Sequence, residues 1–120
     1  MQCDSIDPLI EEPSCDEGRV YLGTLAKQGL CMNYVITVEG EVPEEWYEQG
    51  LVAETWVDPY EETTYNNAFR LGSICDFPET IKEGDQFYFI PFSQEEQLCM
   101  QCLAYSPTPS EVMQIKVCLN

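Results

Sequence analysis

Short runs in which apolar and polar residues alternate recur along most of the chain. Alternation with a period of two, at intervals of about ten residues, is typical of β-strands in a small all-β domain. In the last run Met113, Ile115, Val117 and Leu119 form a wholly apolar set, which we expect to face a core. The predicted strands lie at residues 20–26, 31–38, 51–57, 68–75, 86–92, 98–105 and 112–119.

Two segments between these runs have a different character. Residues 43–50 begin with proline, continue with acidic residues and end with glycine, a pattern that predicts one short helix. Residues 58–67 begin with Asp-Pro and end with Asn-Asn, which favours an interior loop. The sequence therefore predicts an all-β fold, a small OB-like or Greek-key β-barrel of six to seven short strands with one short helix, stapled by disulfides.

The N-terminal segment does not continue this pattern. Residues 1–17 hold six carboxylates and two prolines and cannot bury a core face, so we interpret them as an acidic tether. A chain of 120 residues has room for one domain. We assign residues 18–120 to a single β-barrel domain.

The net charge of the chain limits the classes of partner that it can bind. Five basic residues against 22 acidic ones give a net charge of −17, which repels phosphate backbones and anionic lipid headgroups. The chain contains no histidine, which excludes Ser-His-Asp and Cys-His nucleophiles and histidine-ligated metals. Glutamates between residues 39 and 48 are interpreted as a solvated acidic face. We therefore expect no catalytic residue, no metal, no cofactor and no nucleic-acid partner.

Seven cysteines are many for a chain of this length and leave two interpretations open. Either they form disulfides in an exported protein, or some are thiolates for metal or redox chemistry. Only Cys99 and Cys102 have C-x-x-C spacing, and no second pair completes a metal tetrahedron. We favour disulfides, with Cys31 joined to Cys99 or Cys102 and Cys15 to Cys118 as candidate pairs. The six candidates are Cys15, Cys31, Cys75, Cys99, Cys102 and Cys118.

Cys3 is left over, and its surroundings are similar to the mature start of a bacterial lipoprotein, where a lipidated cysteine precedes a short acidic linker. Further along, Gly29-Leu30-Cys31 with Tyr34 and Ile36, the stretch 42–46 with 50–52, and the final 115–117 strand resemble small OB-like β-barrel domains of bacterial envelope lipoproteins. That resemblance covers about half the chain, and the sequence differs from the family between residues 58 and 82. It implies a location outside the cytoplasm, in the periplasm or on the outer membrane, with a lipid anchor at Cys3 as the contact with the membrane. It implies no known chemistry.

The 58–67 loop is the candidate partner-binding site. Aromatic rings supply contact area, and amide side chains supply direction toward a protein or a glycan. The alternative is that the rings fold back and cap the barrel. The candidate residues are Trp56, Tyr60, Tyr65, Asn66 and Asn67.

The predicted function is thus a non-catalytic binding or accessory module of a bacterial cell envelope. Two alternatives remain. One is a cytosolic cysteine-rich metal-binding or redox protein that uses Cys99 and Cys102. The other is a secreted inhibitor that presents residues 106–109, Ser-Pro-Thr-Pro, as a rigid loop.

Overall fold

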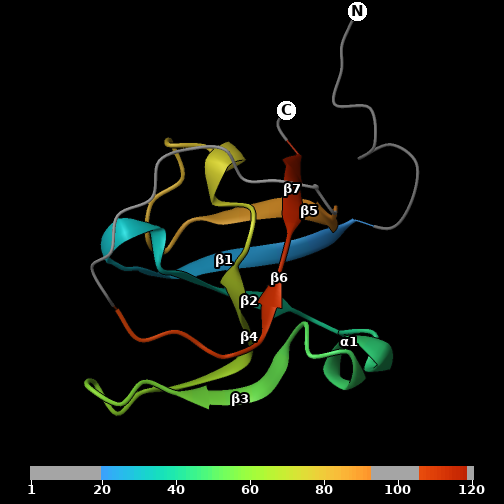
Figure 1. The fold of residues 1–120 in the computed structure, drawn as a ribbon. Helices are drawn as coiled ribbons and strands as arrows, with labels where there is room; N and C mark the ends of the chain where they lie inside the picture. Colours follow the sequence, from blue (N-terminus) through green and yellow to red (C-terminus); the bar gives the residue numbers. More distant parts are fainter. Residues whose placement is uncertain (1–19, 93–105, 119–120) are drawn as a thin grey trace, which may run out of the picture.

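The computed structural model describes residues 20–92 and 106–118, and these form a mostly antiparallel sheet with one short α-helix (Figure 1). The strands are β1 (Tyr21–Gln28), β2 (Tyr34–Glu39), β3 (Ala53–Val57), β4 (Thr64–Leu71), β5 (Gln86–Pro91), β6 (Val112–Met113) and β7 (Ile115–Cys118). Strands such as β1 and β5 alternate buried and more exposed positions, whereas β3 has no fully buried residue. Helix α1 is Glu44–Glu48, and the 3₁₀ turns η2 and η3 are Leu30–Met32 and Ile74–Asp76.

The strand order is β3-β4-β2-β1-β5-β7, and β6 lies off this path beside β4. Strands β1 and β2 form an antiparallel hairpin whose register shifts between Leu25 and Lys27, which is the mark of a β-bulge. Strand β4 pairs with β2 along one edge. Its other edge is shared by β3, over residues 64–68, and β6, over residues 70 and 71. Strands β2 and β1 are therefore central, and β5 lies nearer one end.

The sheet is not closed, which corrects the predicted barrel. Strand β7 pairs with β5, but the preceding β6 contacts β4 through only two residue pairs. Gln114 separates the two strands, and its carbonyl accepts a hydrogen bond from the Phe92 amide at 3.0 Å. The last segment changes partner at this residue instead of pairing with both neighbours along its length. The all-β class is confirmed, and closure is not.

Aromatic and branched side chains fill the core between the sheet, the helix and the last segment. Phe69 and Phe89 are fully buried, with ring centroids 6.1 Å apart. Met113, Ile115 and Val117 are all buried, which confirms the predicted apolar face, and Leu119 lies outside the described residues. The aromatic run 86–92 is only partly buried, since Tyr88 in β5 is 52% exposed and Phe92, which follows β5, is 39% exposed.

The predicted helix is correct and packs through one large ring. Trp46 is buried, and its ring centroid lies 4.6 Å from that of Tyr21. The carbonyl of Trp46 also accepts hydrogen bonds from the amides of Leu51 and Val52. These bonds fix α1 beside the start of β3.

Several predicted boundaries are wrong. The strand predicted at 68–75 ends at Leu71, because Ile74–Asp76 form the turn η3. The 58–67 loop ends at Thr63, because Thr64 to Asn67 already pair within β4 or lie between its paired residues. The predicted strand at 31–38 begins only at Tyr34, because Cys31 and Met32 have positive φ values of 55° and 63° and close the turn η2. The predicted strand at 98–105 and the tether at 1–17 lie outside the described residues.

Candidate functional site

The turn between β3 and β4 is built around a buried carboxylate. Asp58 follows β3 directly and is 0% exposed. Its Oδ1 accepts hydrogen bonds from the backbone amides of Tyr60 at 2.8 Å and Glu61 at 3.3 Å. Its backbone amide donates to the Thr63 carbonyl at 2.9 Å, and its own carbonyl accepts from the Glu62 amide at 2.7 Å. Four backbone groups of one short turn therefore bond to a single residue, which fixes the direction in which the turn projects.

Lys27 supplies the charge that balances this carboxylate. It lies at the β-bulge near the end of β1, and its Nζ forms an ion pair with Asp58 and a second one with Glu61 Oε1 at 3.2 Å. Its side chain is only 18% exposed. The β3–β4 turn is thus fastened to β1, to which β3 is not paired in the sheet.

The protonation of this pair follows from its surroundings. Burial on its own would raise the pKa of Asp58, but the hydrogen bonds from Lys27 and from the Tyr60 and Glu61 amides outweigh it and hold the pKa below its usual value. The hydrogen bond to Asp58 raises the pKa of Lys27, although burial opposes it. Both groups are charged at neutral pH, so the turn is held by an ion pair with little access to water.

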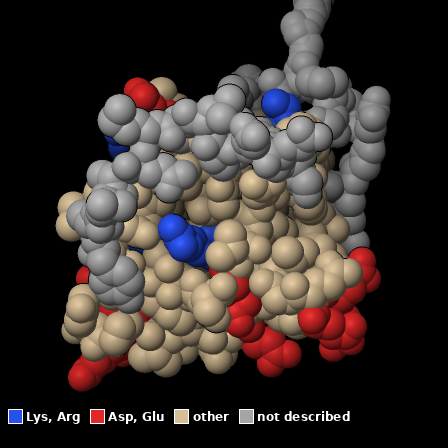
Figure 2. All heavy atoms as spheres, in the orientation of Figure 1, with Lys and Arg blue, Asp and Glu red and all other residues tan. Residues whose placement is uncertain are grey.

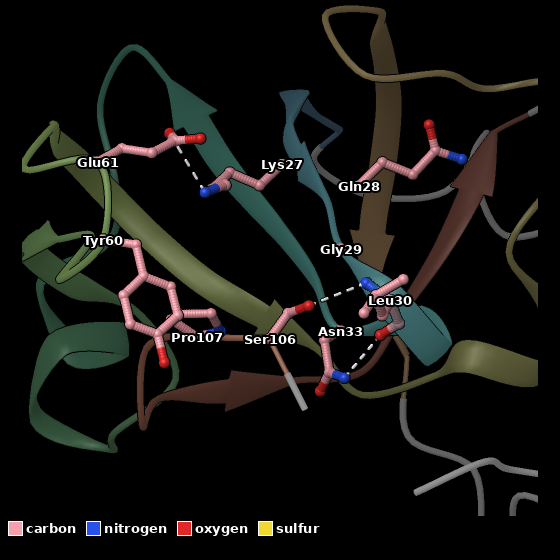
Figure 3. A pocket seen from close by; sticks show the side chains of 9 residues that line it. All are labelled: Lys27, Gln28, Gly29, Leu30, Asn33, Tyr60, Glu61, Ser106 and Pro107. Atoms are coloured by element: carbon pink, nitrogen blue, oxygen red, sulfur yellow. Dashed lines mark hydrogen bonds and ion pairs between the residues drawn. The ribbon is translucent and has the colours of Figure 1, made fainter. Parts of the chain in front are cut away.

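A pocket of about 320 Å³ opens beside this turn (Figure 3). Lys27 and Glu61 lie at one end of it, and Leu30, Asn33 and Ser106 lie toward the other, where the Leu30 amide donates to Ser106 Oγ at 3.0 Å. Three segments far apart in the chain therefore meet here: the β1–β2 connection, the β3–β4 turn and the segment that begins at Ser106. The lining residues are Lys27, Gln28, Gly29, Leu30, Asn33, Tyr60, Glu61, Ser106 and Pro107.

The lining of the pocket combines exposed apolar side chains with polar groups. Tyr60 is 76% exposed and Leu30 is 63% exposed, so both present apolar surface to solvent at the pocket. The side-chain amide of Asn33 donates to the Leu30 carbonyl at 2.6 Å, which orders the η2 side. Such a combination of exposed rings, an aliphatic side chain and ordered polar groups can bind a partner's side chain or a sugar ring.

The predicted partner-binding aromatics separate into two kinds. Trp56 and Tyr65 face each other across β3 and β4 and are half-buried, with stacked rings 5.7 Å apart at an interplanar angle of 24°. Burial raises the pKa of Tyr65, which the charge of Lys27 partly offsets. Only Tyr60 projects freely, so of the three it alone lines the pocket.

The two predicted amides also differ. Asn66 is exposed on β4, whereas Asn67 is half-buried and accepts a hydrogen bond from the Tyr47 hydroxyl at 2.6 Å. Asn67 has a positive φ of 56° although it lies within β4. The structure therefore places Asn67 in a contact between β4 and α1, and neither amide lines the pocket.

Several pocket residues were missed by sequence reasoning. Lys27, Leu30 and Asn33 lie in segments that were interpreted as strand or turn, and Ser106 was considered only as part of a candidate inhibitory loop. One signal was present, namely a lysine in a chain with only five basic residues, 31 positions before an Asp-Pro turn. Nothing in the local pattern indicates that these two residues meet.

The other predicted sites are only partly covered by the described residues. Cys31 lies in η2, Cys75 in η3 and Cys118 at the end of β7. Cys3, Cys15, Cys99 and Cys102 lie outside residues 20–92 and 106–118. In those two ranges no group of three or more acidic, cysteine or histidine side chains could hold a metal ion, and no helix is long and apolar enough to cross a membrane. The 106–109 segment is half-buried up to Thr108 and buried at Pro109, so it does not project as an inhibitory loop would.

Many exposed acidic residues lie along one border of the molecule. Figure 2 shows acidic side chains at both ends of the lower border and in its middle, and a further group at the upper left. The exposed carboxylates include Glu44, Glu45 and Glu48 of α1, Glu54 of β3, and Glu61 and Glu62 of the turn.

Comparison with known proteins adds no assignment to this site, because no protein family, curated protein or solved structure matches the chain.

Proposed function

We propose that this protein is a non-catalytic binding module of a bacterial cell envelope, which contacts a protein or glycan partner at the pocket beside the β3–β4 turn. The observation that carries the proposal is the buried Lys27–Asp58 pair, which holds Tyr60 exposed at the pocket mouth. A large exposed ring on a turn that is already ordered binds at a lower entropic cost than one on an unfastened loop.

The location outside the cytoplasm rests on the cysteines and on the resemblance to envelope lipoproteins. An oxidising compartment is where disulfides form and persist. Disulfides at Cys31, Cys75 and Cys118 are part of this proposal and would persist in such a compartment. Lipidation of Cys3 would then tether the domain through the acidic segment 1–17, while the charge of −17 keeps the domain itself off anionic membranes.

A screen with two arms tests the binding role. The oxidised protein is applied to a random peptide display library and to a glycan array, and each ligand found is measured again with Tyr60→Ala and with Tyr88→Ala. Tyr88 is a matched control because it is 52% exposed on β5 and does not line the pocket. We expect Tyr60→Ala to weaken the ligand at least tenfold and Tyr88→Ala to leave it within twofold. The arm that gives the ligand identifies its class.

Two results would contradict the proposal. If neither arm gives a ligand that Tyr60→Ala loses, the pocket is not the contact site. If thiol counting on protein purified without reductant finds six free cysteines, or elemental analysis finds one zinc or copper per chain, the envelope assignment is wrong. A cytosolic thiol or metal protein would then replace it.

A further inference from the structure

Strand β3 is the end of the sheet, and its outer edge carries no strand within the described residues. It pairs with β4 alone, from Ala53 opposite Ala68 to Val57 opposite Thr64, and Figure 1 shows it along the border of the fold. In an edge strand, alternate residues direct their N–H and C=O groups away from the sheet. Such an edge is a template on which another extended segment can pair.

Three of the features that commonly block such an edge, namely proline, lysine and a β-bulge, are missing from β3 itself. The strand contains no proline and no lysine, and its pairing with β4 keeps one register without a bulge. Thr55 is exposed and Val57 is 54% exposed, and both are β-branched residues that favour strand pairing. The backbone of β3 is therefore free to accept a partner of suitable charge.

Charge decides which partner fits. Glu54 is exposed on β3, and further exposed carboxylates lie on α1, next to the start of the strand, and at Glu61 and Glu62, just beyond its end. The acidic surface at both ends of this border is visible in Figure 2. A second copy of the chain would bring another net charge of −17 and a second Glu54 to the same edge, which like-charge repulsion opposes. A cationic segment meets attraction at the strand and at both of its ends.

We propose that β3 binds an extended, cationic segment of a partner protein by strand addition. Main-chain hydrogen bonds to β3 supply the pairing, and Lys or Arg side chains of the partner meet Glu54 and the carboxylates beyond the strand ends. The half-buried Trp56 ring, on the same face as Glu54, provides contact area for the aliphatic part of such a side chain. This inference goes beyond the pocket at Tyr60, because it uses a different surface and a main-chain mode of binding.

The test is an NMR titration of the ¹⁵N-labelled oxidised protein with a blocked peptide, Lys-Val-Thr-Val-Thr-Val-Lys. The control peptide has glutamate at both ends. We expect the cationic peptide to shift the amide resonances of residues 53–57 and to slow their hydrogen exchange at least threefold. The shifts should weaken as salt is raised from 50 to 500 mM, since screening shortens the reach of these charges. The acidic peptide should produce neither effect.

A pair of charge reversals makes the test specific. Glu54→Lys and Glu79→Lys change the net charge equally, and Glu79 is exposed in the connection between η3 and β5. We expect Glu54→Lys to raise the Kd for the cationic peptide about five- to tenfold, which is the range for reversing one partly desolvated pair, and Glu79→Lys to raise it less than twofold.

Three outcomes would overturn the inference. Shifts confined to Gly29, Leu30 and Ser106 would place the peptide in the pocket, which leaves the proposed function standing and removes strand addition. Equal effects of the two reversals would indicate attraction by net charge alone. Protection of β3 that rises with protein concentration, without peptide, would show that a second copy occupies the edge.

Discussion

Replacing Lys27 with methionine removes the ammonium group that pairs with the buried carboxylate of Asp58. The Asp58 side chain is 0% exposed, so it keeps only the two amide donors of Tyr60 and Glu61. Removing one member of a buried pair costs about 3–5 kcal/mol, because the remaining charge stays away from water. Lys27 is 18% exposed, which admits some solvent, so we expect the loss of unfolding free energy at pH 7 to be about 3 kcal/mol.

The same substitution also alters how the free energy of unfolding depends on pH. In the wild-type protein the pKa of Asp58 is lower folded than unfolded, so its contribution to stability is present above the unfolded pKa and is lost as pH falls through the folded pKa. We expect Lys27→Met to raise the pKa of Asp58 relative to the wild-type protein, because the hydrogen bond from Lys27 is the largest influence that lowers it and burial still opposes the charge. The variant should therefore gain stability relative to wild type as pH falls from 7 toward 4.5, because the buried carboxyl takes up a proton.

Urea unfolding followed by tryptophan fluorescence at pH 7 and pH 4.5 measures both effects. With an m-value of about 1.5 kcal/mol/M, a loss of about 3 kcal/mol lowers the midpoint by about 2 M. Asp58→Asn is the control, since its amide oxygen can still accept from the two backbone amides. The double variant Lys27→Met/Asp58→Asn should be more stable than Lys27→Met alone. The reasoning is refuted if Lys27→Met lies within 1 kcal/mol of wild type at pH 7, or if the two single changes simply add.

Two further substitutions test the packing that positions the site. Ser73→Ala should lower the free energy of unfolding by about 2 kcal/mol, because the buried Ser73 Oγ accepts a hydrogen bond from the Ile115 amide at 3.0 Å and donates one to the Ile115 carbonyl at 2.8 Å. Hydrogen exchange of the Ile115 amide should become faster in the variant. Unchanged exchange would contradict the prediction. Gly23→Ala should lower the free energy of unfolding by about 1–3 kcal/mol, since the added Cβ lies 3.0 Å from the fully buried Phe89 ring, which cannot move aside. Thermal unfolding measures this loss. An unchanged stability would mean that the core can shift at this position.

The sequence by itself determined the class of fold and most of its strands. Period-two alternation reports which side of a strand is buried, so Met113, Ile115 and Val117 could be assigned to the core from spacing alone. Proline, acidic residues and glycine at residues 43–50 indicate the helix for local reasons of backbone geometry and charge. The exposed Tyr60 was selected because an Asp-Pro turn carries it.

Only the tertiary structure decided what the site consists of. Lys27 and Asp58 are 31 positions apart, and their pairing depends on how the β-bulge in β1 places the lysine beside a turn from another hairpin. Whether the sheet closes likewise depends on the last segment, which pairs with β4 before Gln114 and with β5 after it. No local pattern within residues 112–118 indicates this change of pairing. Local pattern follows from the interaction of each residue with solvent and with its own backbone, whereas the pocket and the free edge of β3 follow from contacts between segments distant in sequence.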